Sequence, residues 1–130
     1  MHETINNLIK IQNQLKNKNL DLNEESPKII AVSKSFSKEM IIPLIQHGHT
    51  DYGENKIQEA LKKWTDLKIK YPKIKLHMLG KIQTNKVKYL LPLFDYIHSL
   101  DSLKIAEKIA DEEIKKVKKL KIFIQVNIAN

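Results

Sequence analysis

The chain has few of the residues on which several common kinds of protein depend. Cysteine is absent from its 130 residues, which excludes disulfides, thiolate metal ligands and a cysteine nucleophile. Only three glycines are present, and no G-x-G-x-x-G or G-x-x-x-x-G-K-[ST] loop for binding phosphate occurs. No apolar run approaches the ~18 residues of a membrane-spanning helix, so we expect no membrane partner. The first residues, Met1 to Ile5, do not form a secretory signal, and a cytoplasmic location is the simplest interpretation.

Arginine is also missing, so the net charge of +8 comes from lysine alone. Nucleic-acid sites usually add arginine forks or stacked aromatics to their lysines, and aromatic residues make up only 6% of this chain. The lysines are spread along the chain. The densest cluster, Lys115–Lys119, lies at the end of a predicted helix, where cations suit the helix dipole. We expect a solvated basic face and no nucleic-acid partner, with a basic interaction surface as the alternative.

The five histidines do not form a metal site that the sequence can define. His47 and His49 flank a glycine in a predicted turn, and the other three are isolated along the chain. No helical i, i+4 pair of histidines with an acidic residue between them is present, and no carboxylate cluster accompanies them. We therefore predict no metal ligand.

The hydrophobic pattern predicts one domain, residues 1–130, in which helices and strands alternate. The predicted helices are 4–18, 38–47, 56–70, 84–92 and 101–118, and the predicted strands are 28–34, 49–53, 74–80, 94–100 and 121–128. A polar loop is predicted at 17–27. Alternation of this kind indicates a parallel sheet with right-handed crossovers, and both an open doubly wound sheet and a (β/α)₈ barrel fit it. The fifth strand has no helix after it, so we expect the domain to be incomplete.

The most informative feature is Lys34, which closes the apolar run from Lys28. A short run rich in β-branched residues predicts a strand buried on both faces. Its carboxyl end would lie at the rim of a parallel sheet, where α/β proteins place their chemistry. A deprotonated lysine amine there forms Schiff bases with aldehydes. An ordinary strand-end lysine that reaches for water is the alternative interpretation.

Polar side chains also follow the other predicted strands, at Asn55, His77, His98 and Asn127. In a parallel barrel these strand ends open on one face and could surround a small ligand. Structural explanations stay open for each of them. Asn55 and Asp101 suit helix N-caps, and the two histidines could be packed residues within their strands.

Several of these segments, taken in order, resemble one known family. The motifs are Ala31-Val32-Ser33-Lys34, Tyr52-Gly53-Glu54-Asn55 with Gln58-Glu59, Leu76-His77-Met78-Leu79-Gly80 with Gln83-Thr84-Asn85-Lys86, Ile97-His98-Ser99-Leu100-Asp101-Ser102, and Ile124-Gln125-Val126-Asn127-Ile128. Their order and spacing are similar to those of the pyridoxal phosphate homeostasis proteins, the YggS/PROSC family. The resemblance covers nearly the whole chain after the first helix.

The resemblance implies a parallel (β/α) barrel of the alanine-racemase N-terminal type, which here would be truncated after about five of its eight strands. It implies a cytoplasmic carrier or regulator of pyridoxal 5'-phosphate rather than an enzyme. The cofactor would be held as a Schiff base on Lys34, and Asn55, His77 and Asn127 fall on motifs that line the barrel mouth. The phosphate-binding residues of the family lie in the missing part, so weakened binding is expected. A racemase-type Schiff-base enzyme and a non-functional remnant are the alternatives.

Overall fold

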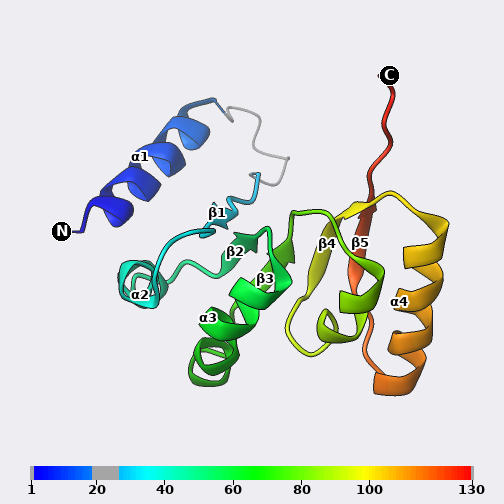
Figure 1. Ribbon diagram of the computed structural model, residues 1–130. Coiled ribbons are helices and arrows are strands. Elements are labelled where there is room, and N and C mark those ends of the chain that lie inside the picture. The colour runs from blue at the N-terminus through cyan, green and yellow to red at the C-terminus, as the bar shows by residue number, and fades with distance from the viewer. Residues whose placement is uncertain (1, 19–26, 130) are drawn as a thin grey trace.

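A computed structural model describes residues 2–18 and 27–129, in which five strands alternate with helices (Figure 1). The α-helices are α1 (Glu3–Lys18), α2 (Lys38–Gln46), α3 (Ile57–Lys70) and α4 (Leu103–Lys116), and the 3₁₀ helix is η1 (Thr84–Tyr89). The strands are β1 (Ala31–Val32), β2 (Asp51–Glu54), β3 (Lys75–Met78), β4 (Tyr96–Leu100) and β5 (Lys121–Ile124). The predicted alternation is therefore confirmed. Most of the predicted loop at 17–27 lies outside the described residues.

All five strands are parallel and follow one another in the order β1-β2-β3-β4-β5. A doubly wound sheet would reverse its strand order at a switch point. An order that continues in one direction is that of consecutive strands in a (β/α) barrel. Within the described residues, β1 and β5 each pair on one side only, and they form the two edges of the sheet (Figure 1).

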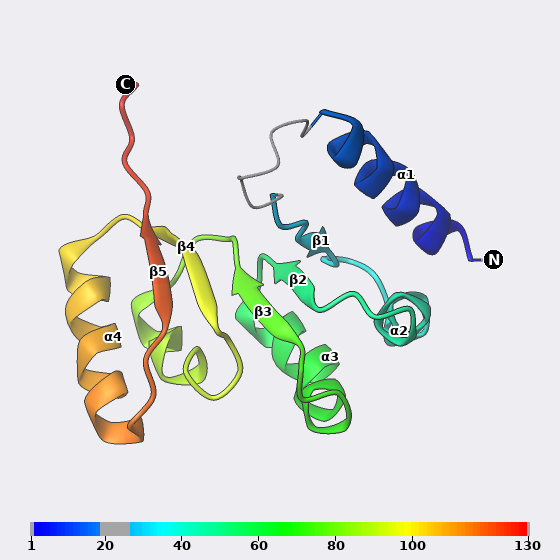
Figure 2. The same ribbon diagram turned by 180° about the vertical axis from the view of Figure 1, so that it is seen from behind.

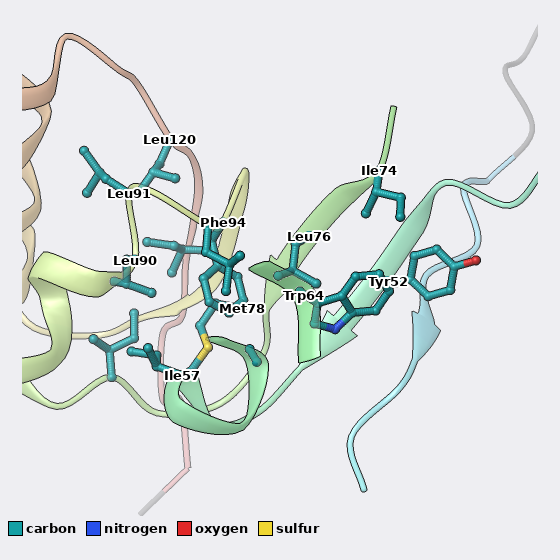
Figure 3. Packing of buried hydrophobic residues seen from close by; sticks show 14 of the residues in the cluster. Tyr52, Ile57, Trp64, Ile74, Leu76, Met78, Leu90, Leu91, Phe94 and Leu120 are labelled. Atoms are coloured by element: carbon teal, nitrogen blue, oxygen red, sulfur yellow. The ribbon is translucent and has the colours of Figure 1, made fainter. Parts of the chain in front are cut away.

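One face of the sheet packs against helices, and the other face is open. Viewed from behind, β3, β4 and β5 lie in front of α3, η1 and α4 (Figure 2). Because side chains alternate along a strand, Tyr52, Leu76 and Ile97 point toward the helices and are fully buried. In this core the centroids of the Tyr52 and Trp64 rings are 4.9 Å apart (Figure 3). We call the opposite side of the sheet, toward which His77 and His98 point, the open face.

The first strand differs from its prediction. A strand buried on both faces is expected over 28–34, but β1 contains only Ala31 and Val32, and the Val32 side chain is 47% exposed. The prediction of burial on both faces is therefore wrong. The reason is tertiary, because within the described residues β1 pairs with β2 alone and lies at an edge of the sheet.

Two predicted helix caps are also wrong. The N-cap of α3 is Lys56 and not Asn55, and the N-cap of α4 is Ser102 and not Asp101. The Ser102 hydroxyl accepts a hydrogen bond from the Ile105 backbone N–H at 3.4 Å. Each N-cap thus lies one residue later than the polar side chain that the sequence suggested.

Candidate functional site

The carboxyl ends of β1, β2 and β3 form a compact rim. Lys34 lies in a turn directly after β1, and its side chain is exposed. The pairing of Val32 with Gly53 brings Lys34 and Asn55 to neighbouring strand ends. After β3, Gly80 packs so closely against this rim that a Cβ atom there would lie 2.1 Å from the Asn55 carbonyl oxygen. Only glycine permits this approach, which holds the ends of β2 and β3 together.

A cavity of ≈ 340 Å³ opens beside Asn55 on the helix side of the rim. Three lysines contribute to its lining, Lys56, Lys81 and Lys86, together with the carboxylate of Glu59. Ammonium groups in excess over carboxylates favour anionic ligands. The rim thus combines an exposed amine at Lys34 with a basic cavity beside the next strand.

A chain of polar side chains crosses the open face of the sheet. The His77 ring lies in the middle of it, with Nε2 at 2.8 Å from Asp51 Oδ2 and Nδ1 at 2.8 Å from Nε2 of His98. Tyr96 stacks on His77 at 4.2 Å between ring centroids, and Phe123 stacks on His98 at 4.7 Å. Both nitrogens of the His77 ring are therefore occupied, and the ring is only 4% exposed.

This chain has a defined electrostatic character. Burial by itself raises the pKa of Asp51, but the hydrogen bonds from Thr50 and His77 outweigh it, so the pKa lies below its ordinary value. Burial lowers the pKa of His98, and the neighbouring His77 lowers it further. The ionised Asp51 carboxylate accepts a hydrogen bond from the His77 Nε2–H, and one of the two rings donates in the hydrogen bond between His77 Nδ1 and His98 Nε2. The arrangement favours a neutral His98 ring.

A second network lies on the helix side, beneath the Lys34 turn. The fully buried Glu54 carboxylate accepts hydrogen bonds at Oε1 from Lys63 Nζ at 2.7 Å, Trp64 Nε1 at 2.8 Å and Ser33 Oγ at 3.0 Å. Lys63 is itself 7% exposed and also donates to the Ser33 carbonyl at 2.6 Å. A buried ion pair with this many hydrogen bonds ties α3 to the ends of β1 and β2.

The structure brings together some of the predicted site residues and separates others. Lys34 and Asn55 are neighbours at the rim. His77 lies on the open face of the sheet, away from the rim, and belongs to the polar chain with Asp51 and His98. Asn127 is exposed beyond β5, at the sheet edge opposite to β1 (Figure 1).

Sequence reasoning missed the two networks, although part of their signal is visible. Lys63 lies three residues after Ala60 and four before Leu67, so helical spacing places it on the apolar face of α3. Glu54 lies two residues after Tyr52 and shares its buried face. A lysine and a carboxylate that both face a core predict an ion pair, but Asp51 gives no comparable signal.

The described residues contain neither a group of metal ligands nor a helix suited to a membrane. No three histidine, cysteine or carboxylate side chains in residues 2–18 and 27–129 are grouped so that they could hold a metal ion. None of the described helices is both long and apolar enough to cross a membrane.

Comparisons with known proteins identify relatives. The chain is 38% identical over 105 residues to the pyridoxal phosphate homeostasis protein of Vibrio alginolyticus, an alignment that covers 79% of this chain and 45% of the relative. It is 39% identical over 121 residues to the protein of the same name from Buchnera aphidicola, with 93% and 52% covered. The chain spans about half the length of the curated relatives it matches. No family model matches it.

Among solved structures, PipY of Synechococcus elongatus with PLP bound has a similar fold. The TM-score is 0.80 and the sequence identity 31%, and the alignment covers 94% of this chain and 53% of PipY. The parallel sheet and its strand order are thus shared with a protein about twice as long.

Proposed function

Because this chain corresponds to the N-terminal part of the pyridoxal phosphate homeostasis proteins, we propose that it binds pyridoxal 5'-phosphate as a Schiff base on Lys34. The observation that carries the proposal is the position of Lys34, an exposed amine at the carboxyl end of β1, on the rim where parallel α/β proteins bind ligands. The proposed role is carriage of the cofactor within the cytoplasm, without catalysis of a reaction by this chain.

The residues at the rim fit the chemistry of the ligand. The amine of Lys34 would hold the cofactor by condensing with its aldehyde to a Schiff base, with release of water. Asn55, on the neighbouring strand end, would offer an amide to the same ligand. The lysines of the adjacent cavity suit an anionic group.

His77 and Asn127 have less direct roles in the proposal. His77 would act from the open face through His98, because both of its own ring nitrogens are engaged. In a closed eight-stranded barrel the ends of β1 and β5 lie on opposite sides of one mouth. Asn127 would then approach the ligand from the side opposite to Lys34.

We also propose that residues 1–130, taken by themselves, form part of a (β/α) barrel and bind the cofactor more weakly than the full-length relatives. The support is its coverage of about half of each relative. Phosphate sites in barrels of this kind are usually built by loops after the late strands. The five described strands leave that contribution out.

The test is chemical trapping. The purified chain would be incubated with pyridoxal 5'-phosphate and reduced with borohydride, and the labelled peptides would be mapped. We expect Lys34 to be labelled at lower cofactor concentration than the other lysines. Lys34→Ala should abolish this preferred labelling, whereas Lys28→Ala, at the other end of the same segment, should leave it unchanged. Equal labelling of many lysines in the unaltered chain would overturn the proposal.

A further inference from the structure

The turn that carries Lys34 has a backbone conformation that its sequence does not favour. The Phe36 N–H donates to the Ser33 carbonyl at 3.2 Å and closes a four-residue turn, in which Lys34 and Ser35 are the central residues. Ser35 has φ +64°, in the left-handed region. A turn with positive φ at its third residue favours glycine there, so serine needs support from its surroundings.

Glu59, in the first turn of α3, supplies support on one side of Lys34. Its Oε1 accepts a hydrogen bond from the Ser35 backbone N–H at 2.7 Å. This hydrogen bond is also the main reason why the pKa of Glu59 lies below its ordinary value, and the nearby Lys63, with Nζ 3.6 Å from Glu59 Oε1, acts in the same direction. Glu59 therefore holds the Ser35 N–H with an ionised carboxylate, which is a stronger hydrogen-bond acceptor than a neutral oxygen.

Lys63 and Glu54 hold the residue on the other side. The Ser33 carbonyl accepts from Lys63 Nζ, and the Ser33 hydroxyl donates to the Glu54 carboxylate. The Ser33 N–H also donates to the Gly53 carbonyl at 2.9 Å. The backbone on both sides of Lys34 is thus fixed by side chains of α3 and by β2, while the Lys34 side chain itself is exposed.

We propose that Glu59 and Lys63 are positioning residues for Lys34, which clamp its turn so that the amine is presented to a carbonyl ligand at the rim. The inference rests on the proposed function, because Glu59 and Lys63 can position Lys34 for a ligand only if Lys34 binds that ligand. When the turn is already ordered, the reaction of the amine does not include the loss of conformational entropy that ordering the turn would require. The clamp therefore distinguishes Lys34 from the other exposed lysines.

Glu59→Ala tests the clamp, because Glu59 is partly exposed and its loss removes the acceptor for Ser35. The chain would be titrated with pyridoxal 5'-phosphate, reduced with borohydride, and analysed for label at Lys34 and elsewhere. We expect half-labelling of Lys34 to need roughly tenfold more cofactor, as for the loss of one charge-assisted hydrogen bond, with no change at other lysines. Glu59→Gln, which retains an oxygen acceptor, should recover most of the difference.

Two further variants separate positioning from other effects. Glu39→Ala removes an exposed carboxylate from the first turn of α2 and is matched in charge, and it should leave Lys34 labelling unchanged. Ser35→Gly added to Glu59→Ala should restore labelling, because glycine adopts positive φ without help. A general loss of folded structure in Glu59→Ala would not be rescued in this way.

The outcomes distinguish this inference from the proposed function. If the unaltered chain shows no preference for Lys34, the proposed function fails. If the unaltered chain prefers Lys34 and Glu59→Ala is labelled identically, the clamp is overturned while the proposed function stands. Equal loss of labelling in Glu39→Ala and Glu59→Ala would also overturn it, because net charge would then be the cause.

Discussion

At the scale of single residues, the Glu54–Lys63 pair shows how much a buried charge depends on its partner. Both side chains are almost completely buried, and Glu54 Oε2 has no hydrogen-bond partner among the described residues. Removal of one member of such a pair costs more than the pair contributes, because the other charge stays buried without compensation.

We expect Lys63→Met to lower the free energy of unfolding by about 3 to 5 kcal/mol, since the Glu54 carboxylate then lacks its cation. The measurement is urea denaturation followed by circular dichroism. Lys62→Met changes the neighbouring, exposed lysine of α3 in the same way and should have little effect. Equal losses in the two variants would contradict the assignment.

The polar chain on the open face predicts a pH dependence of stability. Burial lowers the pKa of His98 from the ordinary value of 6.5, so the unfolded state binds more protons than the folded state near that pH. The contribution of His98 to the free energy of unfolding is therefore fully present above about pH 6.5. It is lost as the pH falls through the lower pKa of the folded state. His49, whose pKa burial also lowers, contributes in the same direction.

His98→Asn should make the decrease in stability between pH 7 and 5 shallower, because the histidine contribution is removed while a side-chain amide that can hydrogen-bond to His77 is kept. The check is a series of denaturation midpoints across that pH range. His2→Asn, an exposed histidine before α1, is the control and should leave the slope as it is. If the denaturation midpoints of the original chain and of His98→Asn depend on pH with the same slope, His98 does not contribute to the pH dependence of stability.

At the scale of elements, the start of α4 separates two polar residues that look equivalent in the sequence. Asp101 and Ser102 are both good N-cap residues. The structure gives the capping hydrogen bond to Ser102, whose hydroxyl accepts from the Ile105 N–H.

Ser102→Ala should therefore lower the free energy of unfolding by about 1 kcal/mol. Asp101→Ala, one residue earlier, should cost clearly less. Thermal or urea denaturation of the two variants side by side gives the comparison. A larger loss for Asp101→Ala would restore the cap position predicted from the sequence.

At the scale of the whole molecule, the sheet has two edge strands, because within residues 2–18 and 27–129 β1 and β5 each pair on one side only. The side chains of Ile124 and Val126, on and after β5, are 74% and 70% exposed. An exposed apolar edge strand offers free backbone groups to another chain. Such an edge recruits further strands unless something covers it.

The 130-residue chain should therefore self-associate as its concentration rises, which sedimentation velocity would measure. Ile124→Lys together with Val126→Lys should reduce this association, because lysine on an edge strand opposes pairing. Ile114→Lys, at an equally exposed apolar position on α4, introduces a charge away from the edge and serves as the control. An unchanged sedimentation coefficient at all concentrations would exclude pairing through β5.

The sequence by itself determined the alternation of helices and strands, the parallel sheet and the position of Lys34 after the first strand. These features follow from local periodicity and from the right-handed crossover, which act over a few residues or one repeat. The placement of Lys34 and Asn55 at the same edge of the sheet follows as well, because parallel strands end at the same edge.

Only the tertiary structure decided the strand order, the exposure of Val32 and the separation of Asn127 from Lys34. It also decided that Glu59 and Lys63 hold the Lys34 turn, and that Asp51, His77 and His98 form one chain. These outcomes depend on which strands become neighbours and which faces are covered. The physical reason is that hydrogen bonds between residues 20 or more positions apart are set by packing, which local pattern does not encode.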